Sequence, residues 1–355
     1  MAGAARLSAA GAPVAFPRFV PRAPWWGGDL QTVRNTMLGA RDDLARWPGE
    51  RVSFAMPDGS GDRLSAMLHR PDGEACGPLV VILHGLTGCE DSVHVRASAA
   101  YFLARGWPAL RLNLRGAGPS RKSCRGLYHA GRTDDLRAVL DVLAAEPGAG
   151  DIVVLGYSLG GNVALKLLGE AGAAPLPGRV RAAASVSAPI DLAATWRNFR
   201  RPRNRLYQAW LLARMKEEAV APGAAVSEAE RRAVAGARTI FEFDDSFVAP
   251  RNGFAGADNY YARCSSAHVL ARIGLATLLI SARDDPWVPV APYMAHDWQA
   301  TPALTPLLPR RGGHVGFHGR GGRAAWHDLC AERFFAAALA HPSRRTGPRP
   351  RASTA

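Results

Sequence analysis

The chain has 355 residues, of which 48% are hydrophobic, so it can hold one large α/β domain with an insertion or two small domains. No apolar run approaches the roughly 20 residues of a membrane helix, and residues 1–25 lack the apolar region of a secretory signal. The five cysteines are scattered without a Cys-x-x-Cys pair. This pattern disfavours a disulfide framework or a zinc site, and it predicts a globular protein of the reducing cytoplasm.

The formal net charge of +14 raises the question of a nucleic-acid partner. Only three of the 44 basic residues are lysines, and the arginines are mostly scattered along the chain rather than gathered in stripes. We therefore expect solvated basic surface and no nucleic-acid partner.

The two ends of the chain differ in composition from its middle. Residues 1–24 are rich in Ala, Pro and Arg, residues 341–355 are rich in Pro and Arg, and both segments are expected to be disordered. The remainder divides into a predicted α/β core, residues 25–188 and 274–340, and an insertion, residues 189–273.

Apolar runs of strand length recur through the predicted core. Residues 51–57 and 63–69 alternate apolar and polar side chains around a Pro-Asp-Gly turn, which predicts an antiparallel hairpin at a sheet edge. The following runs alternate with helical patterns, which indicates right-handed crossovers and a mostly parallel sheet flanked by helices. The predicted strands of this part lie at 78–83, 108–114, 152–156, 181–187, 276–281 and 305–308.

The first of these strands ends in the glycine-rich stretch 84–88. In a hydrolase of this architecture the loop after this strand supplies one backbone N–H of the oxyanion hole, here that of Leu86. His84 is a conceivable base, but a histidine at a strand end beside glycine more often fixes the loop.

The central motif is Gly156-x-Ser158-x-Gly160, which lies between a buried apolar strand and a helical pattern that begins at Val163. This arrangement predicts a nucleophile elbow, a tight turn that projects the serine hydroxyl above the sheet. The N–H group of Leu159, directly after the serine, would be the second oxyanion donor.

The insertion 189–273 shows helical stretches, including 196–218 and 227–240, and no clear strand. It is expected to form a helical cap over the strand ends. Apolar side chains between 196 and 211 alternate with five arginines. Two interpretations stay open: a lid for an apolar acyl group with peripheral contact to an anionic membrane, or an amphipathic cap helix with a solvated basic face.

The remaining candidates follow the last two strands. Asp284 and Asp285 come after strand 276–281, and Asp285 is the preferred acid, with Asp284 as the alternative because adjacent turn residues face different directions. His314 follows Gly312-Gly313 after the last strand and is preferred as the base over His318.

The order Ser158, Asp285, His314 is that of the α/β-hydrolase fold and differs from that of other serine hydrolases. The three residues would act as nucleophile, orienting acid and general base through an acyl-enzyme, with no metal or organic cofactor. An ester is the small-molecule substrate that this chemistry predicts.

Several stretches of the sequence together match a known family: 30–32, 84–88 with Ser92, 113–116, 128–131, 156–162, 243–245 with 253–254 and 260–261, 282–286 and 312–317. Through them the chain resembles the YheT-like branch of the α/β hydrolases, the AB-hydrolase-4 family of carboxylic-ester hydrolases. The resemblance implies the same serine, aspartate and histidine, esterase or lipase-like activity on short acyl esters, and phospholipid substrates for some relatives. Thr87 and Ala117 depart from the family pattern beside the oxyanion loop.

Three functional hypotheses follow. The first is a carboxylic-ester hydrolase that acts on short- to medium-chain acyl esters. The second is a lipase-like, phospholipase-like or acyltransferase activity on lipid esters. The third is a non-catalytic scaffold that binds lipid or protein through the basic cap, although such scaffolds usually lose a member of the triad.

Overall fold

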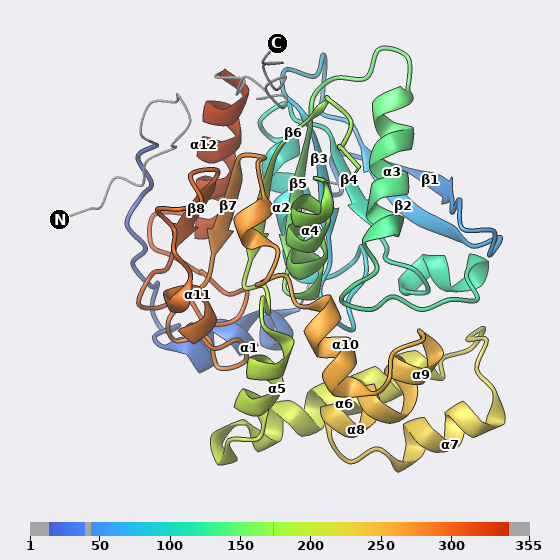
Figure 1. Ribbon diagram of the computed structural model, residues 1–355. Coiled ribbons are helices and arrows are strands. Elements are labelled where there is room, and N and C mark those ends of the chain that lie inside the picture. The colour runs from blue at the N-terminus through green and yellow to red at the C-terminus, as the bar shows by residue number, and fades with distance from the viewer. Residues whose placement is uncertain (1–13, 40–43, 173, 341–355) are drawn as a thin grey trace, which may run out of the picture.

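The computed structural model describes residues 14–39, 44–172 and 174–340, which form an eight-stranded sheet with helices on both faces (Figure 1). The strand order is β1-β2-β4-β3-β5-β6-β7-β8. The β1–β2 and β2–β4 pairs are antiparallel and all other pairs are parallel. The strands are β1 (Gly49–Ala55), β2 (Arg63–His69), β3 (Leu79–Leu83), β4 (Ala109–Leu112), β5 (Ile152–Tyr157), β6 (Val180–Val186), β7 (Thr277–Ile280) and β8 (Leu304–Leu307).

Two apolar cores cover the two faces of the sheet. Helices α3 (Thr133–Ala145) and α4 (Leu159–Glu170) pack on one face, and α2 (Val93–Leu103) and α12 (Trp326–Ala340) pack on the other. Both faces of the central strands are therefore buried. This explains why β5 reads as an uninterrupted apolar run rather than as an alternating one.

The segment between β6 and β7 forms a cap of helices beneath the carboxyl ends of the strands in Figure 1. The stretch 196–218, which the sequence predicts as helical, is divided here, because Pro202 begins a 3₁₀ turn between α5 and α6. The cap helices are α5 (Leu192–Phe199), α6 (Arg205–Ala219), α7 (Glu228–Gly236), α8 (Ile240–Phe243), α9 (Ala249–Arg251) and α10 (Ala257–Cys264), with a π-helical turn at Asp244–Val248.

The N-terminal segment is more closely packed than its composition suggests. Of the predicted loose segment 1–24, the structure describes residues 14–24, and there Val14 is buried and the indole of Trp326 donates to the carbonyl of Pro17 at 2.7 Å. Helix α1 (Gly28–Leu38) follows. Residues 1–13 and the predicted tail 341–355 lie outside the described residues.

Within the described ranges, no helix is both long and apolar enough to cross a bilayer. All five cysteines are free thiols. A cytoplasmic location stays a prediction.

Candidate active site

Ser158 occupies a strained turn between β5 and α4. Its φ of 49° and ψ of −118° lie in a region that non-glycine residues rarely adopt. The flanking glycines are required by close backbone approach: a Cβ on Gly156 would lie 2.6 Å from the carbonyl oxygen of Gly160, and one on Gly160 would lie 2.4 Å from that of His84. The Ser158 N–H donates to the carbonyl of Val186 at 2.8 Å, which ties the turn to β6.

The structure brings Ser158, His314 and Asp285 into one hydrogen-bonded chain. The Nε2 atom of His314 lies 3.0 Å from Ser158 Oγ, and its Nδ1 atom lies 2.9 Å from Asp285 Oδ2. Because the carboxylate accepts from Nδ1–H, Nε2 carries the lone pair that faces the serine hydroxyl. The geometry allows the imidazole to take the proton of Ser158 when the hydroxyl attacks an electrophile.

The two adjacent aspartates of the turn after β7 face different partners. Asp285 is held by three hydrogen bonds, since its Oδ1 accepts from the N–H groups of Trp287 (2.8 Å) and Val288 (2.9 Å) while Oδ2 accepts from His314. Asp284 instead accepts from the N–H of Gly313 at 3.0 Å, and burial raises the pKa of its carboxyl. The preferred acid, Asp285, therefore faces the imidazole, and Asp284 braces the loop that carries it.

The two other candidate histidines, His84 and His318, make contacts that support the surrounding structure. His84 donates from Nδ1 to the carbonyl of Gly85 at 2.7 Å and accepts the N–H of Leu114 on Nε2 at 3.0 Å, and burial lowers its pKa to about 4. The His318 ring lies 3.4 Å from the guanidinium of Arg34. Burial lowers the pKa of His318 to about 3.

Helix α1 supports the loop of His314. The Thr32 hydroxyl donates to the carbonyl of Gly28 at 2.7 Å and accepts the N–H of His314 at 2.8 Å. Gly313 has a φ of 61°, and a Cβ there would lie 2.4 Å from the Gly28 carbonyl oxygen. The sequence indicates Thr32 only through the family resemblance of the stretch 30–32.

The side chain of Trp287 covers one face of the His314 imidazole. Its ring stacks on that of His314, with centroids 4.5 Å apart and an interplanar angle of 27°. The amide of Asn198, on cap helix α5, donates to the carbonyls of Pro286 and Trp287, both at 2.9 Å, and Asn204 donates to Pro286 at 2.8 Å. The cap therefore fixes the segment that places Trp287.

The two predicted oxyanion donors, Leu86 and Leu159, line the same cavity as Ser158. The loop of Leu86 passes directly over the serine, since a Cβ on Gly85 would lie 3.0 Å from Ser158 Cβ. In the parts of the chain that the structure describes, neither the N–H of Leu86 nor that of Leu159 donates to a protein acceptor. Both groups are thus available to an anionic oxygen near Ser158.

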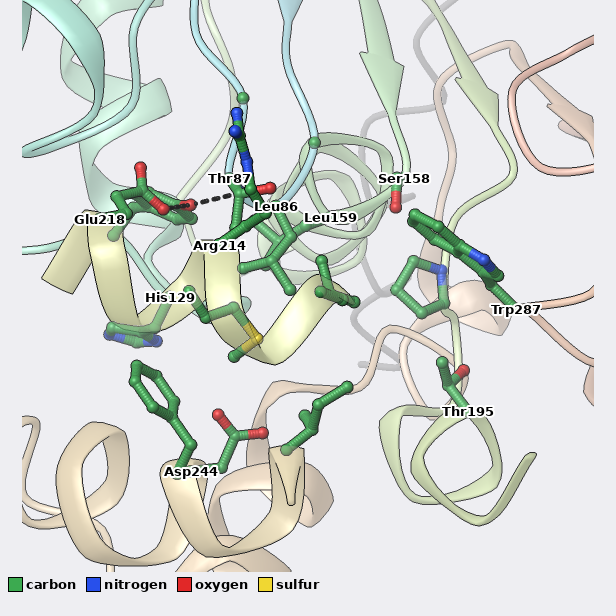
Figure 2. Close-up of a pocket in the computed structure, with 18 of the residues that line it drawn as sticks. Leu86, Thr87, His129, Ser158, Leu159, Thr195, Arg214, Glu218, Asp244 and Trp287 are labelled. Carbon is green, nitrogen blue, oxygen red and sulfur yellow. Dashed lines mark hydrogen bonds between the residues drawn. The ribbon is translucent and has the colours of Figure 1, made fainter. Parts of the chain in front are cut away.

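Ser158 and His314 line a cavity of about 450 Å³ between the core and the cap (Figure 2). Most of its wall is apolar. Two carboxyl groups of the cap also face it, those of Glu218 and Asp244, and burial raises the pKa of each to about 7. The apolar lining includes Leu86, Leu159, Trp196, Phe199, Leu211, Met215, Ile240, Phe243, Phe247, Val248, Tyr261, Trp287 and Val315.

Among the residues described, no group of three or more His, Cys, Asp or Glu side chains is arranged to hold a metal ion.

The chain matches a known protein family and is similar in sequence to several known proteins. The family described as "alpha/beta hydrolase fold" matches residues 78–320. The protein named "Putative esterase YheT" from Escherichia coli (strain K12) is 34% identical over 275 residues, which cover 74% of this chain and 77% of that relative. Phospholipase ABHD3 from Mus musculus is 30% identical over 245 residues, 68% of this chain and 58% of its own length.

Among solved structures, that of the 2,6-dihydroxy-pseudo-oxynicotine hydrolase is similar with a TM-score of 0.56. The similarity covers 88% of this chain and 72% of that one. At 20% identity it is a likeness of fold.

Proposed function

Because this chain belongs to the α/β-hydrolase family, in its YheT-like branch, we propose that it is a serine-dependent carboxylic-ester hydrolase with Ser158, His314 and Asp285 as its catalytic triad. The observation that carries the proposal is the hydrogen-bonded chain from Asp285 through His314 to a strained serine at the wall of an apolar cavity.

The reaction would proceed in two steps. Ser158 Oγ attacks the acyl carbonyl while His314 Nε2 takes the hydroxyl proton, and the proton then passes to the departing alcohol. Water, deprotonated by the same imidazole, attacks the acyl-enzyme and releases the carboxylic acid. Asp285 keeps Nδ1 protonated and stabilises the imidazolium that forms in each step.

The developing oxyanion would be bound by the N–H groups of Leu86 and Leu159. Such a donor contributes about 3 kcal/mol to transition-state stabilisation in comparable sites. Leu159 is the first residue of α4, directly after the strained turn at Ser158, so its N–H would point toward the oxyanion that forms beside the serine.

We propose short- to medium-chain acyl esters as substrates. The cavity of about 450 Å³ falls in the usual range for small-molecule sites, and its wall is mostly apolar. Trp287, Phe199 and Leu211 would contact the acyl or alkoxy group.

The test is the hydrolysis of p-nitrophenyl esters from acetyl to palmitoyl by the wild type and by Ser158→Ala. We expect turnover that peaks at short or medium chains, and a loss of at least about 10³-fold in kcat for the variant. Thermal unfolding of the variant checks that it is folded, and fluorophosphonate labelling reports the activated serine independently of any ester. Turnover that survives in Ser158→Ala would refute the assignment.

A second candidate is hydrolysis or acyl transfer on lipid esters, with the protein at a membrane surface. Cap helix α6 exposes Leu206 and Trp210, and arginines 200, 201, 203 and 205 lie close by in the sequence. Exposed apolar side chains beside cations suit an anionic bilayer. Serine-dependent turnover that peaks at palmitoyl, and rises with anionic vesicles, would favour this candidate. Product analysis with added alcohols separates transfer from hydrolysis.

A further inference from the structure

The loop that carries Leu86 contains a second strained residue. Thr87 has a φ of 56°, a conformation in which a β-branched side chain is an outlier. Such a conformation persists only where its surroundings hold it. Thr87 directly follows Leu86, so a bond that holds the Thr87 N–H restricts the peptide unit next to the one that carries the Leu86 N–H.

Tyr128 is the group that holds it. Its hydroxyl oxygen accepts the N–H of Thr87 at 2.8 Å, and its ring meets that of His84 edge-on at a centroid distance of 5.8 Å. Tyr128 thus contacts the loop at both ends of the short stretch 84–87. It lies in the loop after β4, and thus in the core rather than in the cap.

The hydroxyl of Tyr128 is itself oriented by the cap. It donates to Oε2 of Glu218, on α6, at 2.6 Å. A phenol has one proton, so donation to the carboxylate leaves its lone pairs free to face the Thr87 N–H.

The same residue of α6 is held a second time. The backbone carbonyl of Glu218 accepts from the guanidinium of Arg121 at 2.6 Å, so both the main chain and the side chain of Glu218 bind the core. In Figure 2, Thr87 and Leu86 lie between Glu218 and Ser158.

From these contacts we infer that Tyr128 and Glu218 are positioning residues that couple the placement of cap helix α6 to the geometry of the oxyanion loop. The cap then does more than enclose substrate, because the Leu86 N–H is correctly aimed only while Glu218 is in place. This inference rests on the proposed function, since it concerns the same oxyanion site.

The experiment uses Tyr128→Phe and the pair Glu218→Ala and Glu218→Gln. Tyr128→Phe removes the acceptor of the Thr87 N–H, so we expect kcat on the best p-nitrophenyl ester to fall about 10- to 100-fold. KM should stay within about twofold. The affinity for an alkylboronic acid of matching chain length, which forms a tetrahedral adduct with the serine, should weaken by the same factor as kcat/KM.

Glu218→Ala should lower kcat in the same way, and Glu218→Gln should restore most of the loss, because an amide oxygen still accepts from the Tyr128 hydroxyl. This pair does not depend on whether Tyr128→Phe folds. Because glutamine keeps an acceptor oxygen but carries no charge, recovery of activity in Glu218→Gln would show that Glu218 acts through its hydrogen bond to Tyr128 and not through a negative charge in the cavity.

Two matched controls lie outside the site. Tyr101→Phe breaks another tyrosine–glutamate hydrogen bond, the one to Glu332, and Glu217→Ala changes the exposed neighbour of Glu218 on α6. Both should leave kcat within about twofold. If Ser158-dependent turnover is present but the Tyr128 and Glu218 variants match these controls, the inference fails alone. If the wild type shows no Ser158-dependent turnover, the proposed function fails and the inference with it.

Discussion

Asp284 and Asp285 are neighbours in sequence, yet their carboxylates face different partners. Asp285→Asn keeps the shape of the side chain but removes the charge that orients the His314 ring, so we expect kcat to fall about 10⁴-fold. Asp284→Asn keeps an oxygen for the Gly313 N–H, and we expect kcat to fall less than about 10-fold. The measurement is steady-state hydrolysis of one p-nitrophenyl ester by both variants and the wild type.

Equal losses in the two aspartate variants would contradict this division of roles. Thermal unfolding serves as the control, because Asp284 is partly buried and its replacement also changes loop stability. A large loss with Asp284→Asn alone would make Asp284 the triad acid.

Ser158 and His314 could be predicted from sequence because each lies in a local pattern, an elbow between strand and helix or a glycine-rich loop after a strand. The choice between Asp284 and Asp285 stayed open there, since the direction of a turn side chain depends on its backbone angles. Thr32, Tyr128 and Glu218 were not predicted as supports of the site. Their contacts join segments that are far apart in the chain, as with Thr32 and His314. The spacing of residues in a sequence indicates local structure and does not predict such long-range contacts.

At the scale of elements, the elbow depends on the close approach of α4 to the loop after β3. In Gly160→Ala the new Cβ would lie 2.4 Å from the His84 carbonyl oxygen and 2.8 Å from Leu83 Cβ. We expect a loss of about 1–3 kcal/mol in the free energy of unfolding. We also expect a lower kcat, because the backbone at His84, which must move, leads directly into the loop of the proposed oxyanion donor Leu86. Denaturant unfolding and ester hydrolysis measure the two effects.

Gly236→Ala is the matched control for this change. Gly236 ends helix α7, and a Cβ there would meet no heavy atom within 4 Å. We expect unchanged activity and an unchanged or slightly higher stability, since alanine favours helix over glycine. If Gly160→Ala behaves like this control, close approach is not what requires glycine at the elbow.

The alternation of strands and helices in the core could be predicted because fully buried parallel strands give uninterrupted apolar runs. The cap was predicted only as helical. Its division into α5 and α6 depends on Pro202, and its arrangement depends on packing between aromatic side chains such as Trp196 and Phe241, whose rings stack at 5.4 Å.

For the whole molecule, the buried carboxyl groups of the cap make stability depend on pH. Burial raises the pKa of Asp244 to about 7, with one hydrogen bond, from the Tyr261 hydroxyl at 2.7 Å. The folded protein therefore holds a proton that the unfolded chain loses above about pH 4. We therefore expect stability to fall as pH rises from about 4 to 7, by about 1.4 kcal/mol per pH unit for this group.

Asp244→Asn removes this contribution and keeps an oxygen for Tyr261. We expect the variant to be close to the wild type in melting temperature at pH 5, and more stable than the wild type at pH 8. Calorimetry at the two pH values measures the difference. Asp245→Asn, on the neighbouring exposed residue, is the control for a change of surface charge. A wild-type-like pH dependence in Asp244→Asn would show that its carboxyl does not titrate in this range.

The sequence predicts where the strands lie in the chain but not the order in which they pair in the sheet. The hairpin of β1 and β2 could be placed at an edge because its two strands are joined by a short turn. In the centre of the sheet β3 lies between β4 and β5, which differs from the chain order, and the paired strands are many residues apart in the sequence. The packing of residues 14–24 on the core is likewise a long-range property, seen in the Arg22 N–H bond to the carbonyl of His318.

The bonds from Asn198 to Pro286 and Trp287 bear on how chimeric hydrolases could be built. Grafting the cap of a relative onto this core is an obvious way to exchange one ester preference for another. Here such a graft would also replace the amide that holds the segment beside Asp285, the proposed triad acid. A chimera that retains Asn198 in the donor cap should therefore stay active where one without it does not.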